Sequence, residues 1–549
     1  MSDRETGRSI GERIIRATVV VGIAHVIFKL ISVVQAIIVG QQLDDATFEK
    51  VYAFAFEGCI FMIFLIGEEV IGPTFLPVFM GEMAQKDESA AWRFVNTIVT
   101  LHVLVLAAIV TLIVNFPGPI VQYLTFWDPV SDPEQFQLAR NSLAWLAPSL
   151  ICLSLGSTTY MLLNGYKRFF LAALGDASWK FCVLICVIIG MAWLKLDYHI
   201  VIIGLLIGSV AKLGTHLIGL VDKLRRFRIG IDLSNPAVAQ MLLLMLPLVA
   251  GIMFAKVRDF YNNITILSYL DTAGLIKANF FGRKLYTTIG WLVPYALSIA
   301  MFPFFCELVA RGQKEKFGEL LTRSGRLLLS VFIPLAFVCL PLSQPACSLL
   351  LQAGKFSAQT ADWTAISMAC YTLVLPAAAI EYMLMQAFFA HRRMVAVTLV
   401  GIGFSLLSMA ISSLGIFAFG ASGVFALVVV ALGFALSRTL KSVALVILLR
   451  RNAPVFPAVE TIVFVLRVVA VGLMAAMVAM LTIGMIGTRA GVDGGKGVLL
   501  LQLAAASATS VVTFVVASRA LRVTEPFEMC RWALEKIRSR SAGGSADQA

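Results

Sequence analysis

Long apolar runs dominate this chain and limit what it can fold into. Residues 19–39 and 459–486 are two examples, and each approaches the roughly 20 residues that a helix needs to cross a bilayer. Charged residues make up only 14% of the 549 residues, against roughly 25% in ordinary soluble domains. Strands of a membrane barrel alternate apolar and polar positions, which these continuous runs do not. The sequence therefore predicts an all-α polytopic membrane protein.

Breaks between the apolar runs set the number of spans. The first run has no small-residue cleavage site after it, so we expect it to be retained as a helix. The pattern predicts about 14 transmembrane helices, at residues 15–40, 50–80, 91–114, 141–164, 169–194, 199–222, 238–266, 273–305, 318–344, 361–390, 394–416, 421–449, 459–486 and 497–521.

Lysine and arginine are distributed unevenly over the loops. One alternate set of loops and termini holds 27 of them and the opposite set holds 7. Because cytoplasmic loops carry the excess of these residues, both termini are predicted to be cytoplasmic, in a bacterial inner membrane. This topology accounts for the net charge of +12, so no nucleic-acid partner is expected. The sparse, outside set is Lys50, Arg140, Lys195, Lys277, Lys355, Arg489 and Lys496.

A weak internal repeat runs through the chain. The sequence FLPVF at residues 75–79 recurs as MFPFF at residues 301–305, and Pro119 recurs as Pro345 at the same sequence offset. A repeat unit of six helices returns the chain to the same side of the membrane, so two parallel lobes are predicted around a central cavity, as in an alternating-access monomer. The expected parts are residues 1–232 (helices 1–6), 233–455 (helices 7–12), 456–522 (helices 13–14) and 523–549 (a cytoplasmic amphipathic tail).

Ten basic residues fall within the predicted helices, where an ionisable group is costly and is a functional candidate by default. Five are interpreted as snorkelling to the membrane surface or as solvating a cytoplasmic helix end, namely Lys180, Lys212, Arg438, Lys441 and Arg467. The other five, in helices 1, 7 and 8, are predicted to line a cationic substrate cavity: Lys29, Lys256, Arg258, Arg283 and Lys284. Acidic residues predicted to line or gate the same cavity are Glu57, Glu68, Glu69 and Asp259.

Such a cavity suits an anionic substrate, because a low dielectric strengthens each charge–charge contact. A diphosphate fits well, with lysine acting as a point charge and arginine as a bidentate clamp. Internal pairing is the alternative interpretation. In that case Asp259 neutralises Arg258, and Glu68 or Glu69 pairs with Lys29.

Signatures of metal binding and catalysis are scarce. The nine cysteines form no CxxC pair and the five histidines have no second ligand at helical spacing, so no metal site is predicted. Without a Walker motif we expect no nucleotide or other cofactor, and the driving force is expected to be a proton, a sodium ion or the membrane potential. A membrane glycosyltransferase could use Asp128, Asp132 and Glu134, but the adjacent prolines favour an ordinary turn. An enzyme is therefore not predicted.

Three motifs resemble those of the MurJ/MviN family of the multidrug/oligosaccharidyl-lipid/polysaccharide exporter superfamily. Residues 67–79 (GEEVIGPTFLPVF) are similar to its signature at the end of helix 2. Residues 352–356 (QAGKF) resemble its Gly-x-Phe motif after helix 9, and residues 280–285 (FFGRKL) resemble its start of helix 8. The resemblance implies a flippase for lipid II, an undecaprenyl-diphosphate-linked peptidoglycan precursor. Membrane lipids and cell-wall synthesis proteins are the further partners it implies.

Individual positions both follow and depart from the family pattern. The resemblance places Lys29 and Lys284 at family arginines and Glu68 at the family glutamate. The second helix-1 arginine and its following aspartate are replaced by Gln35 and Ala36. Further departures are Lys50 at an expected aspartate (with Glu49 beside it), Ile63 and Phe64 near an expected arginine pair, and Arg283 at an expected acid.

Other functions remain open at this level. A drug/cation antiporter of the same superfamily predicts an acidic cavity, and acidic residues are few within the predicted helices. A non-transporting membrane scaffold of cell-envelope synthesis is favoured by the missing family residues. A flippase for lipid II or for a similar lipid-linked oligosaccharide agrees with the cationic helices, the repeat and the motifs together.

Overall fold

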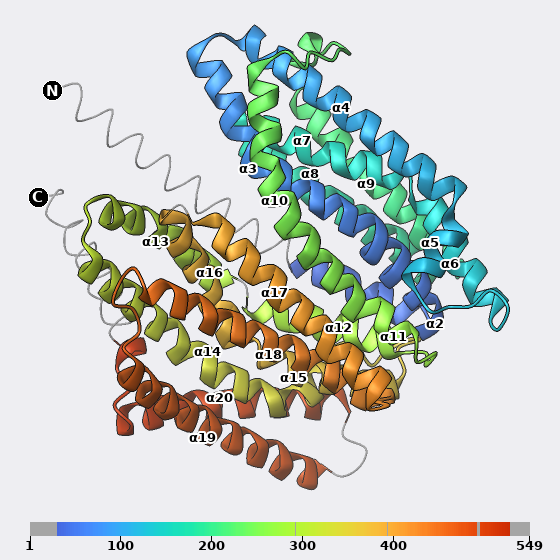
Figure 1. Ribbon diagram of the computed structural model, residues 1–549. Coiled ribbons are helices and arrows are strands. Elements are labelled where there is room, and N and C mark those ends of the chain that lie inside the picture. Colours follow the sequence, from blue (N-terminus) through green and yellow to red (C-terminus); the bar gives the residue numbers. More distant parts are fainter. Residues whose placement is uncertain (1–29, 291, 392, 491–494, 528–549) are drawn as a thin grey trace, which may run out of the picture. The chain divides into compact units, whose positions relative to one another are not determined.

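The computed structural model describes residues 30–290, 292–391, 393–490 and 495–527 (Figure 1). This part of the chain consists of helices and loops and contains no strand. It has 10 helices long and apolar enough to cross a membrane, and up to 13 if each of three bent pairs forms one span. The all-α polytopic prediction is confirmed. The count of 14 stays a prediction, because most of the predicted first helix and Lys29 lie outside the described residues, as does most of the predicted tail.

Two compact units make up the chain. One contains the described residues up to Lys277 together with Ala353–Thr360, and the other contains Ala278–Gln352 and the described residues from Ala361 onward. The lobe boundaries at 232 and 455 divide the chain elsewhere and remain predictions.

Helices of the first unit match the predicted spans closely. Its π-helices, in which the N–H bonds to the fifth residue back, are marked η. The elements are Leu30–Gln42, α2 (Asp45–Thr47), η1 (Phe48–Ile60), α3 (Phe61–Gln85), α4 (Glu88–Asn115), α5 (Pro117–Leu124), α6 (Pro133–Leu146), α7 (Ser149–Gly165), α8 (Phe169–Val187), η2 (Ile188–Trp193), α9 (His199–Gly219), the 3-10 helix η3 (Leu224–Arg226), α10 (Pro236–Phe260), η4 (Tyr261–Thr265) and α11 (Ile266–Ser268).

The second unit follows the same plan and adds two helices. The helix α12 begins in the first unit and continues into the second. The elements are α12 (Leu275–Gly290), α13 (Leu292–Ala310), α14 (Lys314–Leu351), α15 (Ala358–Thr372), α16 (Leu375–Ala390), α17 (Met394–Ser413), η5 (Leu414–Ala418), α18 (Gly423–Arg450), α19 (Ala458–Ala490) and α20 (Lys496–Ala520).

The internal repeat is present in the backbone itself. The broken span α6–α7 bends by 42° and its counterpart α15–α16 bends by 44°. A proline, which has no N–H to donate to the helix, lies at each bend. Each copy also ends a long helix with a π-turn, η2 or η5, where Leu194 N–H donates to Ile189 O and Phe419 N–H to Leu414 O. These two bonds are separated by nearly the same offset as the sequence matches, so both copies share small backbone irregularities as well as helix order.

In the first unit the FLPVF motif of α3 packs against α4 and α7. Phe75 and Phe79 stack with ring centroids 5.8 Å apart, and Phe94 of α4 lies 5.4 Å from Phe75. A Cβ at Gly165 of α7 would come within 2.7 Å of the Phe79 ring. The motif therefore packs in the core of this unit.

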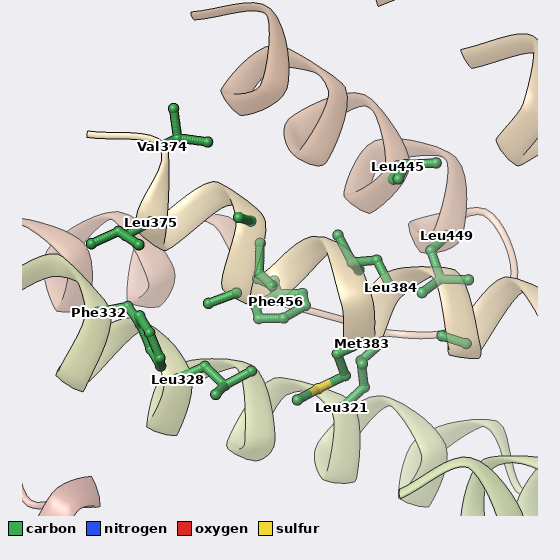
Figure 2. Close-up of a cluster of buried hydrophobic side chains, with 14 of the residues drawn as sticks. Leu321, Leu328, Phe332, Val374, Leu375, Met383, Leu384, Leu445, Leu449 and Phe456 are labelled. Carbon is green, nitrogen blue, oxygen red and sulfur yellow. The ribbon is translucent and has the colours of Figure 1, made fainter. Parts of the chain in front are cut away.

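In the second unit α14, α16 and α18 share one apolar core (Figure 2). Phe456, from the loop after α18, inserts its ring between these helices at a φ of 48°. A Cβ at Gly325 would come within 2.5 Å of that ring, so the glycine makes room for it. The last two helices, α19 and α20, pack on each other and on α14, so they belong to this unit.

We expect Gly208→Ala to destabilise the first unit. The helices α8 and α9 approach so closely that a Cβ at Gly208 would lie 2.6 Å from the main-chain oxygen of Trp179. Backbone cannot move aside cheaply, and overpacking of this kind costs about 1–3 kcal/mol. The thermal unfolding midpoint of the purified protein should fall.

Gly214→Ala on the same helix is the matched control, because no atom lies within 4 Å of its added Cβ. Alanine is the better helix former, so this variant should unfold at the same or a higher temperature. Equal destabilisation by both variants would contradict the packing argument.

Candidate functional site

The structure distributes the predicted cavity cations over both units. Lys256 and Arg258 lie on α10 in the first unit, and Arg283 and Lys284 lie on α12 in the second. Lys29 lies outside the described residues. The substrate-binding role of these residues stays a prediction.

In the first unit both cations of α10 have carboxylate partners. Lys256 Nζ lies 2.6 Å from Glu69 Oε1 of α3, and the Glu69 side chain is 46% exposed. Arg258 binds its neighbour Asp259, with a nitrogen–oxygen distance of 2.6 Å. The internal pairing of Arg258 with Asp259 is thus confirmed, while Glu69 pairs with Lys256. A substrate anion would have to share these cations with carboxylates.

On α12 the cations lie over aromatic rings. The Arg283 guanidinium is 5.3 Å from the centre of the Phe434 ring, and Lys284 Nζ is 5.4 Å from that of Phe280. Such contacts help to hold a cation in place. Phe280 of the FFGRKL motif therefore supports the ammonium group of Lys284 in the same motif.

Glu57 of η1 belongs to a series of hydrogen bonds that reaches the preceding helix, Leu30–Gln42. It shares a hydrogen bond with Tyr52, whose hydroxyl lies 3.4 Å from the Gln35 amide nitrogen. Gln35, which the family resemblance places at an arginine position, is buried. A neutral amide at this position bonds to Tyr52 without adding a buried charge.

Glu49 caps the start of α12. Its Oε1 accepts hydrogen bonds from the N–H groups of Gly274, Ile276 and Lys277, at 2.9, 2.9 and 3.2 Å. The first N–H groups of a helix have no partner within the helix, and its positive dipole end favours an anion there. The sequence offered Glu49 as a substitute for a family aspartate, and the structure assigns it this capping contact.

Lys277, counted among the outside loop residues, is fully buried in the first turn of α12. Its Nζ lies 2.9 Å from Leu43 O and 2.8 Å from Asp45 Oδ1. The ring of Phe356 covers it, with a centroid distance of 4.5 Å. The ammonium is therefore held by a carbonyl, a carboxylate and an aromatic face.

The QAGKF motif supplies part of the same arrangement. Gly354 has a φ of +59°, and a Cβ there would lie 2.4 Å from Gln41 O. The Lys355 N–H donates to that same oxygen at 2.7 Å, and Thr360 Oγ1 donates to Asp45 Oδ2 at 2.5 Å. We call Gln41, Asp45, Lys277, Gly354, Phe356 and Thr360 the latch.

Sequence reasoning missed the latch, although one signal was present. Lys277 follows Lys50 at the same sequence offset that separates Lys29 from Lys256. Lys50 is also buried, with its Nζ 4.0 Å from Glu49 Oε2 and 4.7 Å from the centre of the Trp127 ring. Counting both lysines as loop charges concealed their burial.

Two further clusters hold buried charge. Lys212 of α9 is 1% exposed and binds Asp176 of α8 at 2.8 Å, so the snorkelling interpretation is wrong for this residue. In the second unit Glu381 of α16 binds Arg438 and Lys441 of α18, each at 2.7 Å. Arg438 follows Lys212 at the offset of the FLPVF repeat, so the repeat places a carboxylate-paired cation on the corresponding helix of each unit.

We expect Lys277→Met to destabilise the protein by roughly 3 kcal/mol, because it leaves the Asp45 carboxylate partly buried without its cation. Adding Asp45→Asn removes that unpaired charge. The double variant should therefore lose less unfolding free energy than the sum of the losses in the two single variants. Thermal or denaturant unfolding of the four proteins measures this coupling.

Lys496→Met provides the control at an exposed lysine that begins a helix. Its effect should stay within about 0.5 kcal/mol. If the losses of unfolding free energy in the Asp45 and Lys277 variants simply add, this ion pair does not stabilise the latch.

Comparisons with known proteins agree with the motifs and the fold. A family model described as lipid II flippase MurJ matches residues 39–492. A probable lipid II flippase MurJ from Borreliella burgdorferi is 23% identical over 368 residues, which cover 65% of this chain and 69% of that protein. Its counterpart from Rhizobium meliloti is 23% identical over 344 residues, so the match spans 60% of this chain and 61% of that protein.

Solved structures show the same fold. A lipid II flippase MurJ in an inward closed conformation superposes with a TM-score of 0.72 at 17% identity, covering 92% of this chain and 99% of that one. An inward-facing multidrug resistance MATE family transporter of the MOP superfamily gives a TM-score of 0.62 at 12% identity, covering 81% and 95%. At these identities the likeness concerns the fold alone.

Proposed function

The chain belongs to the lipid II flippase MurJ family, and we propose that it moves lipid II or a similar lipid-linked oligosaccharide from the cytoplasmic to the periplasmic leaflet. The family match over residues 39–492 carries the proposal. The repeated helical units and the intramembrane cations support it. The protein would act in the inner membrane with both termini in the cytoplasm, as the distribution of Lys and Arg indicates.

The cations of α10 and α12 would bind the diphosphate. Lysine offers a point charge and arginine a bidentate fork, and both attract phosphate more strongly where water is scarce. The carboxylates of Glu69 and Asp259 keep Lys256 and Arg258 paired in the described structure. Arrival of a diphosphate would exchange one anionic partner for another, so the resting cavity avoids unpaired charge.

The latch would close the outside end of the transport path. Lys50, Lys277 and Lys355 all belong to the sparse, outside set of basic residues. The contacts of Asp45 with Lys277 and Thr360 tie the first turns of α12 and α15 to α2. Release of the glycan to the periplasm would require these contacts to separate and water to replace them.

No Walker motif occurs in the sequence, so transport would be driven by the membrane potential or by a coupled ion. The protein would act as a transporter, with no chemical change of the lipid. A drug/cation antiporter and a non-transporting scaffold of cell-envelope synthesis are the alternatives that the following experiment separates.

Complementation tests the proposal. A bacterium depleted of its lipid II flippase should grow when it expresses this chain, and lipid II should become exposed at the periplasmic face. The double variant Lys256→Gln, Lys284→Gln should lose at least about tenfold in exposed lipid II, since a lost charged contact costs about 1.5–3 kcal/mol. Lys256→Arg, Lys284→Arg is the charge-preserving control and should retain rescue.

Failure of the wild-type chain to rescue, despite normal membrane expression, would contradict lipid II flipping and favour another lipid-linked glycan or a scaffold. Rescue that survives both glutamine substitutions would contradict the assignment of these cations to the diphosphate.

A further inference from the structure

Both ring nitrogens of His216 face main-chain carbonyl oxygens. Nδ1 lies 3.0 Å from Gly156 O of α7, and Nε2 lies 3.0 Å from Ala172 O of α8. A carbonyl oxygen only accepts hydrogen bonds, and a neutral imidazole has a single N–H to donate. Both contacts are hydrogen bonds only when the ring carries a second proton and becomes an imidazolium.

A neighbouring hydroxyl serves the neutral ring. Thr159 Oγ1 lies 3.1 Å from Nδ1 of His216 and 3.0 Å from Leu155 O. When the ring is neutral the hydroxyl donates to Nδ1, and when Nδ1 carries a proton the hydroxyl donates to Leu155 O instead. The same heavy-atom positions therefore satisfy both protonation states, with one hydroxyl rotation between them.

His216 occupies a tightly packed pocket. His216 is fully buried between α7, α8 and α9. A Cβ at Gly175 would lie 2.0 Å from its Nε2, so only glycine leaves room for the ring at this point of α8. Tyr160 of α7 contributes the nearest aromatic ring, with centroids 6.1 Å apart.

Charged groups on α8 and α9 act on His216. On α9, Lys212 stands one turn away from it, and on α8 the partner of Lys212, Asp176, stands one turn after Ala172. Lys180 of α8 acts electrostatically on Asp176, and Glu68 of α3 acts on Lys212. Lys212 and Asp176 neutralise each other as an ion pair. Protonation of His216 therefore adds one positive charge beside this ion pair in the first unit.

Arg168 and Asp222 form an ion pair at the end of the helix that carries His216. Gly219 is the last residue of α9, and its carbonyl accepts a hydrogen bond from Arg168, which also binds Asp222 at 2.6 Å. Hydrogen bonding to Arg168 lowers the pKa of Asp222 to about 2. Asp222 thus stays ionised across the physiological range.

We propose that His216 is a proton-binding site whose occupancy is coupled to transport. The coupling rests on the flippase function proposed above, whereas the proton site rests on geometry alone. The charge around His216 affects the free energy of any step that moves an anion such as a diphosphate relative to it. Such a step is therefore linked to protonation of His216.

Nitrogen NMR of the full chain in lipid nanodiscs, with ¹⁵N-labelled histidine, tests the proton site without transport. The signal that disappears in His216→Gln belongs to His216. It should change from one protonated ring nitrogen to two as the pH falls from about 8 to about 5. A ring that keeps one neutral tautomer over this range would overturn the proposal.

Thr159→Val sharpens the same measurement. Without the hydroxyl, the unprotonated Nδ1 would face only the oxygen of Gly156, so the neutral ring loses its partner. The midpoint for imidazolium formation should move to higher pH. No shift, or a shift to lower pH, would show that Thr159 does not serve the neutral state.

Lipid II flipping in proteoliposomes tests the coupling. The wild-type rate should change several-fold between about pH 6 and 8, and His216→Gln should flip with a flat profile. His102→Gln is the matched control, because His102 is paired to the hydroxyl of Thr158 through one ring nitrogen. It should keep the wild-type profile. A wild-type profile in His216→Gln would overturn the coupling.

The NMR titration tests proton binding by His216 independently of the proposed flippase function. If the wild-type chain flips no lipid II at any pH, the flippase proposal fails, and the NMR titration still decides whether His216 binds a proton.

Discussion

A charge at membrane depth costs several kcal/mol unless a partner or water holds it, and this constraint orders the polar interior of the protein. Lys212 is matched by Asp176, Arg438 and Lys441 by Glu381, and Lys256 by Glu69. Partners come from neighbouring helices, so each pair also fixes how two helices pack. An anion that binds Lys256 would have to compete with the carboxylate of Glu69.

Helix positions were predictable because they depend on local composition. Most of the described spans begin and end within a few residues of the predicted ones, and the two copies of the repeat bend at matching places. Apolar length and proline position are both visible in a single sequence. The repeat strengthened the prediction, because helix breaks found in one copy recur at matching positions in the other.

The polar contacts were less predictable, because they depend on which helices meet. Lys212 and Lys277 looked like interfacial and loop residues, yet both are buried. Nothing in their local sequence indicates that Asp176, or Asp45 from a distant part of the chain, would lie within 2.8 Å. The motif QAGKF was visible, but the reason for its glycine, close approach to Gln41 O, requires the fold. Pairing of charges is thus a tertiary property even where each charge is obvious.

The long π-helix η1 affects how this family should be compared. Over Phe48–Ile60 the chain winds with more residues per turn than an α-helix, and at its end Phe61 N–H bonds to Phe56 O, five residues back. A helical wheel drawn at about 100° per residue drifts out of phase across this segment. Glu49 at one end and Glu68 beyond the other are therefore displayed on different faces from those the wheel assigns. Relatives that wind this segment as an ordinary α-helix would present different side chains to the same neighbours, even where the aligned letters agree.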